Sequence, residues 1–423
     1  MSWNHRYRGR RFLRSSLYVV PIVCMVLALF AAPQIRWFDD QTQWTLMEFG
    51  SVGAKAIVAA QSSSLLTIIV FSFSIILVGV QIASGQLTPR IIARVFESQL
   101  TKVTLGGFMF SYTYSLAALG QVEERVPQLP VMVAILLSLV SIALFLYLVQ
   151  RLSQNLRPAS ILADVADDTQ AVIDAIYSRS YSPRDEARAG LRLDITQSKR
   201  IIHFNRRART LRAFDETGLV AIATRAVCVI ELVPQAGDFL ATGGELFRIY
   251  GDRATTVDEM DLLRCVVLGR ERALDQDPAF GFRIIVDIVS KALSPAINDP
   301  TTCVLAIDQL YNLLHCLGKR KLDPGWVTDG SGEVRLVYRT PDWADFVTLA
   351  ATEIRLLGGR SPQVTRRLKA MLEHLVRVLP EPRTGVLREE MALLQRTIDG
   401  QYTDPADRAL AAISDAQGFG SRL

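Results

Sequence analysis

The chain has few of the residues that usually carry metal or redox chemistry. It contains four histidines, and three of them, His203, His315 and His374, stand far apart. Its cysteines are equally scattered: Cys24, Cys228, Cys265, Cys303 and Cys316. Metal sites and redox pairs usually show short spacings such as C-x-x-C, and none occurs here. We therefore expect no metal and no cofactor, and in a cytoplasmic domain no disulfide.

Motifs of the common enzyme classes are also missing. The sequence has no nucleophile elbow, no P-loop and no G-x-G-x-x-G, and the Gly358-Gly359 pair follows no predicted strand. Basic residues are not interleaved with aromatic ones, as they are on a nucleic-acid-binding surface. These absences argue against an enzyme and against a nucleic-acid partner.

Charged side chains are missing from four long stretches within the first 150 residues. The stretches lie between Arg14 and Arg36, Lys55 and Arg90, Lys102 and Glu123, and Arg125 and Arg151. A helix of about 20 apolar residues crosses the hydrocarbon core, and backbone amides in lipid must bond within the helix. We predict an α-helical membrane domain over residues 1–157, with four transmembrane helices and the lipid bilayer as partner. Because the stretches hold no ionisable residue, a proton-driven pump is disfavoured.

The arginines and lysines between these stretches predict the orientation. The N-terminal arm, the loop after the second stretch and the exit of the fourth are rich in them: Arg6, Arg8, Arg10, Arg11, Arg14, Arg90, Arg94, Lys102, Arg151 and Arg157. The two alternate loops carry more acidic residues. By the positive-inside rule, the N-terminus and the C-terminal domain are cytoplasmic. We expect a multi-pass protein of the bacterial cytoplasmic (inner) membrane.

The second uncharged stretch is longer and more polar than an anchor requires. It covers about 34 residues, or about 50 Å of helix. Ser64, Thr67, Ser74 and Gln81 fall on one helix face, and Gln61 flanks it. The face either lines a water-filled path or packs against another helix through hydroxyl groups. In the third stretch, Gly107, Ser111 and Ser115 form a small-residue ridge, which we interpret as a packing face.

The remaining sequence predicts a cytoplasmic α+β domain. Residues 158–215 are read as a charged helical linker. Residues 216–251 alternate short β-rich runs with glycine turns and predict a small β subdomain. Residues 252–423 are mainly helical, with one hairpin near Val327–Tyr338 whose turn is Asp329-Gly330.

The small β subdomain resembles half of a biotinyl- or lipoyl-type sandwich. The likeness lies in the turns at Gly237-Asp238 and Gly243-Gly244. A carrier domain needs a lysine on an exposed hairpin, and no lysine occurs between Lys199 and Lys291. We therefore predict a β-sandwich-like element without the carrier function.

Pairs of a capping residue and a proline predict several helix starts. They are Asp277-Pro278, Asp299-Pro300, Thr340-Pro341, Ser361-Pro362 and Asp404-Pro405. The side-chain oxygen accepts from free amides of the first turn, and proline at the first helical position loses no hydrogen bond.

One segment carries a family resemblance. The acidic-Pro-Ala-Phe-Gly helix start at Asp277–Gly281 is followed by Leu-Ser-Pro-Ala-Ile-Asn-Asp-Pro at Leu293–Pro300. With the LGGFMFSYTYSL, GDFLATGGEL, PDW and SPQV segments, this pattern closely resembles the bacterial predicted membrane protein family catalogued as domain of unknown function 2254. The resemblance spans nearly the whole chain. It implies four membrane helices with a cytoplasmic domain, and no activity.

The link between the two helices of this segment has two readings. Its candidate residues are Ser294, Pro295, Asn298, Asp299 and Pro300. They form a polar site for an ion or a neighbouring subunit, or they only cap the second helix and tie the turn together.

Two functions remain open from the sequence. The polar second helix and the uncharged spans favour a homo-oligomeric channel or transport-related protein, with the cytoplasmic domain as a vestibule. The alternative is a membrane-anchored sensor or scaffold, whose cytoplasmic domain binds a protein partner or a metabolite.

Overall fold

The computed structural model describes residues 16–42, 49–86, 99–122, 126–155, 157–182 and 198–418, with Trp3, Tyr7, Gly9 and Phe12. The chain divides into two compact units. The bundle unit comprises Arg8–Ser160, and the C-terminal unit comprises Ile161–Leu423 together with Met1–Tyr7.

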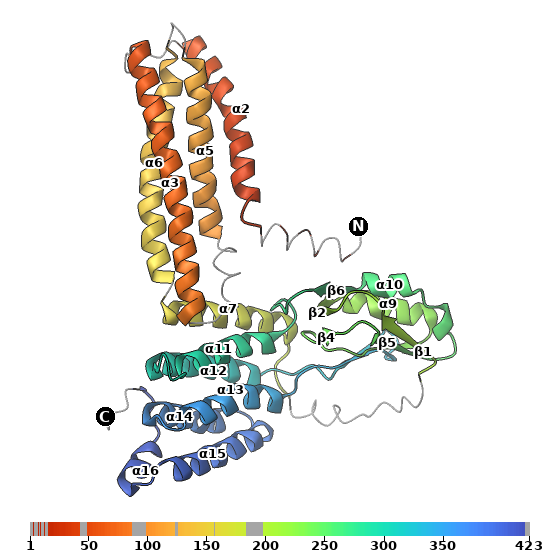
Figure 1. The fold of residues 1–423 in the computed structure, drawn as a ribbon. Coiled ribbons are helices and arrows are strands. Elements are labelled where there is room, and N and C mark those ends of the chain that lie inside the picture. Colours follow the sequence, from red (N-terminus) through yellow and green to blue (C-terminus); the bar gives the residue numbers. More distant parts are fainter. Residues whose placement is uncertain are drawn as a thin grey trace. The chain divides into compact units, whose positions relative to one another are not determined.

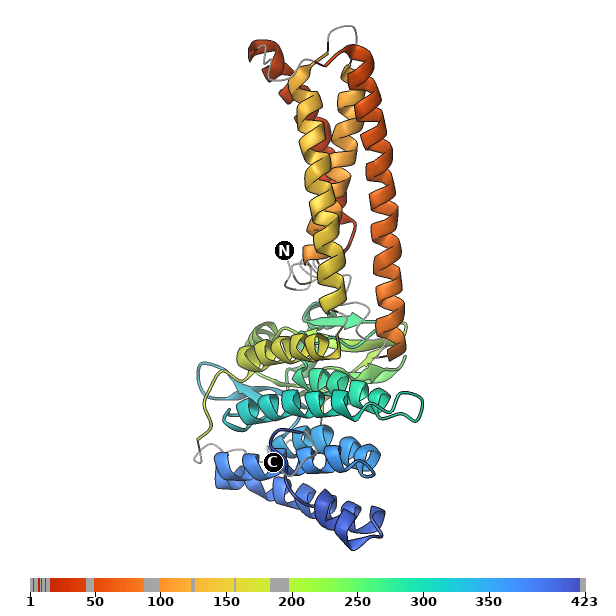
Figure 2. The ribbon, with the colours of Figure 1, turned by 90° about the vertical axis from the view of Figure 1, so that its left-hand side faces the viewer.

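The bundle unit is built from long helices that lie side by side in both views (Figure 1, Figure 2). They are α2 (Val19–Thr42), α3 (Ser51–Gln86), α5 (Gln99–Gln121) and α6 (Gln128–Asn155). The predicted second span is one continuous helix of 36 residues, α3. Helix α5 contacts each of the other three and has the largest share of buried residues, so it is the most sheltered helix of the bundle.

Three described helices are long and apolar enough to cross a membrane: α2, α3 and α6. The prediction of four transmembrane helices is therefore corrected to three candidates. The third uncharged stretch does form a long helix, α5, but its hydropathy is lowered by glycine, serine, threonine and tyrosine. The burial of α5 explains this composition. Its surface meets neighbouring helices, and small polar residues permit close helix packing.

Apolar side chains fill most of the bundle interior in three clusters. Leu105 and Phe108 of α5 belong to one, Tyr114 and Ala118 to the second, and Val122 to the third. The ridge predicted on α5 packs as expected. A methyl group added at Gly107 would come within 3.2 Å of Leu144, and Ser111 accepts a hydrogen bond from Ser141 of α6.

The β part of the C-terminal unit contains two sheets. Its strands are β1 (Arg200–Phe204), β2 (Arg209–Phe214), β3 (Val229–Leu232), β4 (Phe239–Leu240), β5 (Gly244–Tyr250), β6 (Val266–Gly269), β7 (Trp326–Thr328) and β8 (Val334–Tyr338). One sheet has the order β1-β5-β3-β8-β7 and the other β4-β2-β6. All pairs are antiparallel except β3 with β8.

Helices and a shared core hold these strands together. The helices are α9 (Glu216–Ala226), the 3-10 turn η2 (Ala254–Thr256) and α10 (Glu259–Arg264). Ile230 of β3 pairs with Ile249 of β5 on one side and Leu336 of β8 on the other. All three side chains are fully buried, so they form the centre of the apolar core.

The predicted helical linker over residues 158–215 is corrected in its second half. Helix α7 (Pro158–Ile176) is helical as predicted, and residues 183–197 lie outside the described part. The basic segment that follows forms strands β1 and β2. The reason is alternation: Ile202, Phe204, Leu211 and Ala213 point into the core, while arginines and a histidine alternate with them. The many charges of this segment obscure its two-residue period in the sequence.

The β-rich runs after Val227 and the later hairpin form the strands that the sequence predicts. Gly237 and Gly243 have φ of +95° and +84°, which explains the turns there. The hairpin of β7 and β8 turns at Asp329, whose carboxylate accepts from the backbone of Ser331 and Glu333. Helix α9 and strand β6 were not predicted.

The helical part of the C-terminal unit follows the β part. It consists of α11 (Pro278–Ala292), α12 (Pro300–Gly318), α13 (Trp343–Gly358), α14 (Pro362–Val378), α15 (Glu381–Gln401) and α16 (Pro405–Ala411). In Figure 1 these helices stack in layers, with α14 between α12 and α15. Helix α7 packs on α11, since a methyl group added at Gly281 would collide with the Thr169 hydroxyl.

Three of the five predicted caps form: Asp277, Asp299 and Asp404 each accept from amides of the following first turn. Ser361 stands at the N-cap of α14 without a side-chain bond. The expected start at Thr340-Pro341 is wrong. Helix α13 begins two residues later, because Asp342 and Asp345 form a capping box.

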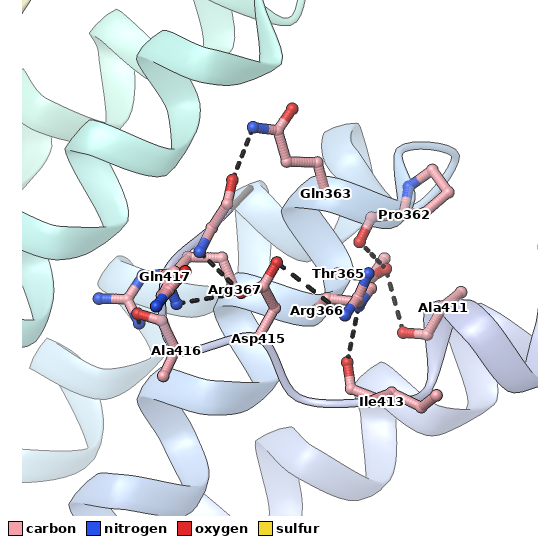
Figure 3. Close-up of polar contacts among 11 residues, drawn as sticks. Pro362, Gln363, Thr365, Arg366, Arg367, Ala411, Ile413, Asp415, Ala416 and Gln417 are labelled. Atoms are coloured by element: carbon pink, nitrogen blue, oxygen red, sulfur yellow. Dashed lines mark hydrogen bonds and ion pairs between the residues drawn. The ribbon is translucent and has the colours of Figure 1, made fainter. Parts of the chain in front are cut away.

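The chain after α16 is held against α14 (Figure 3). Thr365 donates to the Ala411 carbonyl, Arg366 to Ile413 and Arg367 to Ala416. These bonds give residues 411–418 a fixed path over the surface of the helix.

Candidate functional site

The polar face of α3 lies on the outside of the bundle. Ser64, Thr67, Ser74 and Gln81 are all exposed in the single chain, whereas Leu65, Ile69 and Ile76 point to the interior. The four polar residues therefore do not pack against helices of their own bundle. Their surroundings are lipid, water or another molecule.

The hydroxyl groups of this face are satisfied within α3. Ser64 donates to the Ala60 carbonyl at 2.9 Å, Thr67 to Ser63 at 3.1 Å, and Ser74 to Val70 at 3.1 Å. A hydroxyl that donates to its own helix keeps its lone pairs, so it can still accept from water or contact a cation. The arrangement is electrically neutral along its length.

Gln61 is separated from the other four candidates. Its Oε1 is buried inside the bundle and has no hydrogen-bond partner among the described residues. The outer polar face thus consists of Ser64, Thr67, Ser74 and Gln81, whereas Gln61 belongs to the bundle interior.

Polar groups on other bundle helices were missed from the sequence. Ser141 of α6 donates to Ser111 of α5, and the hydroxyl of Ser138, three residues earlier on α6, is also buried. The spacing of these two serines in an apolar helix was the available signal. Asp39 of α2 is 8% exposed and accepts from the Leu129 amide in the first turn of α6. It caps that helix from a neighbour, and no local sequence pattern encodes such a contact.

The signature link Ser294–Pro300 is an exposed turn between α11 and α12. The Ser294 hydroxyl donates to the Lys291 carbonyl, and the Asp299 carboxylate accepts from both the amide and the hydroxyl of Thr302. Asn298 has φ of +49°, a left-handed conformation that asparagine tolerates. Pro295 and the Asn298 side chain are exposed. Turn and cap geometry account for Ser294, Asn298, Asp299 and the proline that follows.

A cavity of about 250 Å³ lies between the β part and the helices of the C-terminal unit. It is lined by Gln235, Ala279, Arg339, Pro341, Asp345, Phe346 and Leu349. Arg339 is mostly exposed and lies 3.8 Å from Asp238. The lining offers the exposed guanidinium of Arg339 and the carboxylate of Asp345 beside apolar side chains.

Ion pairs fix the helices around this region. Arg283 of α11 bonds Asp287 on its own helix and Glu353 on α13. Hydrogen bonds from Arg283 hold the pKa of Glu353 below its usual range. Asp277 is 3% exposed and pairs with Arg272, yet burial raises the pKa of its carboxyl. Within the described part of the chain, no three His, Cys, Asp or Glu side chains group as metal ligands do.

Comparisons with known proteins agree with the membrane character of the bundle. The profile of a family described as "Predicted membrane protein (DUF2254)" matches residues 14–374. Uncharacterised proteins of Mycobacterium tuberculosis and Mycobacterium bovis are 27% identical over 423 residues, covering 96% of this chain and 81% of theirs. No solved structure matches. The chain belongs to this family of predicted membrane proteins, as its signature link and apolar helices indicate.

Proposed function

We propose that the protein is a homo-oligomeric membrane channel. In this arrangement α3 of each copy turns Ser64, Thr67, Ser74 and Gln81 towards a common axis. The observation that carries the proposal is the exposure of this face on the outside of the bundle. In a single copy the face would meet lipid, where a buried amide such as that of Gln81 costs about 2–7 kcal/mol if unpartnered.

The filled interior of one bundle supports a path between copies. Apolar clusters occupy both ends of the described bundle core, so one copy offers no continuous polar route. A ring of copies would instead place neutral hydroxyl groups along the route, and rings of oxygen atoms are used by channels to replace ion hydration. Apolar Phe71 and Val78 interrupt the polar face and would narrow the route.

Cysteine accessibility tests the proposal with matched controls. The background carries alanine at the five native cysteines. Ser64→Cys and Ser74→Cys are expected to react with a membrane-impermeant methanethiosulfonate in intact vesicles. Leu66→Cys and Phe73→Cys lie at similar depth but about 100° around the helix from Thr67 and Ser74. Both are exposed in the single chain, but in the proposed ring they face away from the water-filled axis, so they should stay unreactive.

Conductance gives the second readout. Purified protein in a planar bilayer should conduct, and the reagent should block the Ser74→Cys variant and spare the Phe73→Cys variant. Equal reactivity on both sides of α3, or a monomer without conductance, would rule out the channel.

The orientation forms part of the same proposal. The arginine pattern favours a cytoplasmic N-terminus and a cytoplasmic C-terminal unit in a bacterial inner membrane, which requires the sheltered helix α5 to cross the bilayer together with the three candidate spans. Reporter fusions after Leu423 and between Glu123 and Arg125 test it. The first fusion should be active only with a cytoplasmic reporter, and the second only with a periplasmic one.

The second candidate function is that of a membrane-anchored sensor or scaffold. The cavity beside Arg339 supports it, because a small ligand could bind there. A small anion is the ligand class that an exposed guanidinium would recognise. A thermal-shift screen of anionic metabolites would support this reading if a stabilising compound loses its effect in Arg339→Ala. Arg264→Ala, an exposed arginine on α10, is the control.

A further inference from the structure

Helices α5 and α6 meet in a continuous antiparallel register. Gly107 lies against Leu144, and Ser111 is bonded by Ser141 at 3.0 Å. Further along, one apolar cluster contains Leu119 with Ile135 and Val122 with Val131. One helical turn beyond Ser111 on α5 is Ser115, and one turn back from Ser141 on α6 is Ser138. The register therefore places Ser115 opposite Ser138, between contacts fixed on both sides.

These two serines differ from the other buried serines of α3, α5 and α6. Ser115 is fully buried, and neither its hydroxyl nor that of Ser138 has a hydrogen-bond partner among the described residues. By contrast, the buried hydroxyls of Ser62 and Ser72 donate to carbonyls of their own helix. An unpartnered hydroxyl in an apolar setting costs about 1–3 kcal/mol, so two facing ones require an explanation.

Gln61 of α3 adds a third polar group near this level. It lies one turn after Val58, which joins the cluster of Leu119 and Ile135, and its buried Oε1 is also unpartnered. Helices α3, α5 and α6 all contact one another. The three groups thus form a polar layer that interrupts the apolar core.

Apolar residues close this layer in both directions along the bundle. Val58, Val122 and Val131 fill the core on one side. Ile69 and Phe108 fill it on the other. The layer is therefore an enclosed site, separate from the outer face of α3.

The chemistry of the layer favours water over an ion. Two hydroxyls and one amide offer both donors and acceptors, and a buried water makes about three hydrogen bonds to such groups. Hard cations prefer six or more oxygen ligands, usually with carboxylates, and a neutral site in hydrocarbon does not offset the loss of ion hydration.

We propose that Ser115, Ser138 and Gln61 form an internal hydration site in the centre of the bundle, where ordered water bridges α3, α5 and α6. Water supplies the hydrogen bonds that the three side chains do not make with each other. The site ties three helices together by bonds that one small solvent molecule can form and break.

Water-edited solid-state NMR of the full chain in lipid vesicles tests the site directly. Magnetisation from water should reach the side-chain carbons of Ser115 and Ser138 in the wild-type protein. In Ser138→Ala the transfer to Ser115 should weaken. Ser62, whose hydroxyl is bonded to Val58, is the control and should receive little. Absence of transfer to Ser115 in the wild type would overturn the proposal.

Thermal stability gives a second test, because a hydrated layer and a dry layer predict changes of opposite sign in the apparent Tm of the serine variants. If water bridges the layer, Ser115→Ala and Ser138→Ala should each lower the apparent Tm by about 2–4 °C, while Ser62→Ala changes it little. A dry layer predicts a higher Tm in both variants, because an unpartnered polar group is removed. That result would reject the hydration site.

The same measurement of apparent Tm, made in different salts, tests whether a cation occupies the polar layer. The apparent Tm should be equal in sodium, potassium and choline chloride at one ionic strength. A rise with one alkali cation that disappears in Ser115→Ala would assign the layer to an ion and overturn the water site.

Discussion

The guanidinium of Arg366 in α14 donates from Nε to the backbone carbonyl of Ile413 at 3.1 Å. The side chain is 2% exposed, and its terminal nitrogen lies 4.0 Å from the carboxylate of Asp415, which is also buried. Asp415 in turn accepts from the amides of Gln417 and Gly418. One buried arginine thus fixes a segment that has no regular secondary structure.

Replacing this arginine should destabilise the C-terminal unit. Arg366→Met removes the donor to Ile413 and leaves the buried Asp415 carboxylate without its cation. Breaking a buried pair in this way costs about 3 kcal/mol. Urea unfolding of the full chain in detergent, followed by tryptophan fluorescence, measures it. Arg360→Met, whose partner Gln401 is exposed, should change stability by less than about 0.5 kcal/mol. Equal effects of the two variants would contradict the role of Arg366.

The backbone of Val227 predicts a stabilising substitution. Val227 ends α9 with φ of 52° and ψ of 50°, and its side chain is mostly exposed. A left-handed conformation costs a β-branched residue about 1–2 kcal/mol, whereas glycine adopts it freely. Val227→Gly should therefore raise the free energy of unfolding by up to about 1 kcal/mol, after the added entropy of the unfolded chain is subtracted. Val227→Ala, which keeps the strain, is the control. A loss of stability with glycine would show that the valine side chain has a packing role.

Two substitutions distinguish the interpretations of the signature link as a polar site or as a helix cap and turn only. Asp299→Ala removes the cap of α12 and should cost about 1 kcal/mol. Asn298→Gly keeps the left-handed turn and should leave both stability and any channel activity unchanged. Thermal unfolding and bilayer conductance provide the measurements. Loss of conductance in a stable Asn298→Gly protein would instead favour the polar-site reading.

The pair of Arg283 and Glu353 predicts an acid-sensitive contact between α11 and α13. The arginine lowers the pKa of the carboxyl below its ordinary value of 4.5. A lowered pKa in the folded state means that the contact stabilises the fold above about pH 4.5 and is lost as pH falls through the lowered value. The effect is small, since Glu353 is 43% exposed and water screens the pair.

The comparison of wild type with Glu353→Gln measures this dependence. The difference in apparent Tm should be largest near neutral pH and shrink as the solution is acidified below pH 4.5. Glu389→Gln, an exposed position on α15, serves as the control and should show no such trend. A constant difference across the whole range would mean that the contact does not depend on ionisation.

Local signals in the sequence predicted much of the fold. The apolar stretches of α2, α3 and α6 and the caps at Asp277 and Asp299 depend on neighbouring residues only. Strands β3, β4 and β5 followed from short apolar runs between glycine turns. Strands β1 and β2 were missed, because arginines dominate their composition. Their pairing with β5 and β6, distant in the sequence, is what stabilises them.

The candidate site was predictable in part. The helical period placed Ser64, Thr67, Ser74 and Gln81 on one face of α3. That period cannot say whether the face turns inward or outward, since this depends on which other helices pack on α3. Ser138 was overlooked because serines in an apolar helix indicate a site only once it is known which helix packs against them.

By itself, the sequence determined that this is a membrane protein of its family, where its apolar helices lie and how four helices of the C-terminal unit, α11, α12, α14 and α16, begin. Hydropathy and capping depend on residues that are close together in the chain, so they can be recognised in the sequence alone. Only the tertiary structure decided that α5 is sheltered by its neighbours, that the polar face of α3 points away from its bundle and that the hydroxyls of Ser115 and Ser138 are buried without a partner among the described residues. Those outcomes depend on packing between segments far apart in the chain, where burial sets the energetic cost of each polar group.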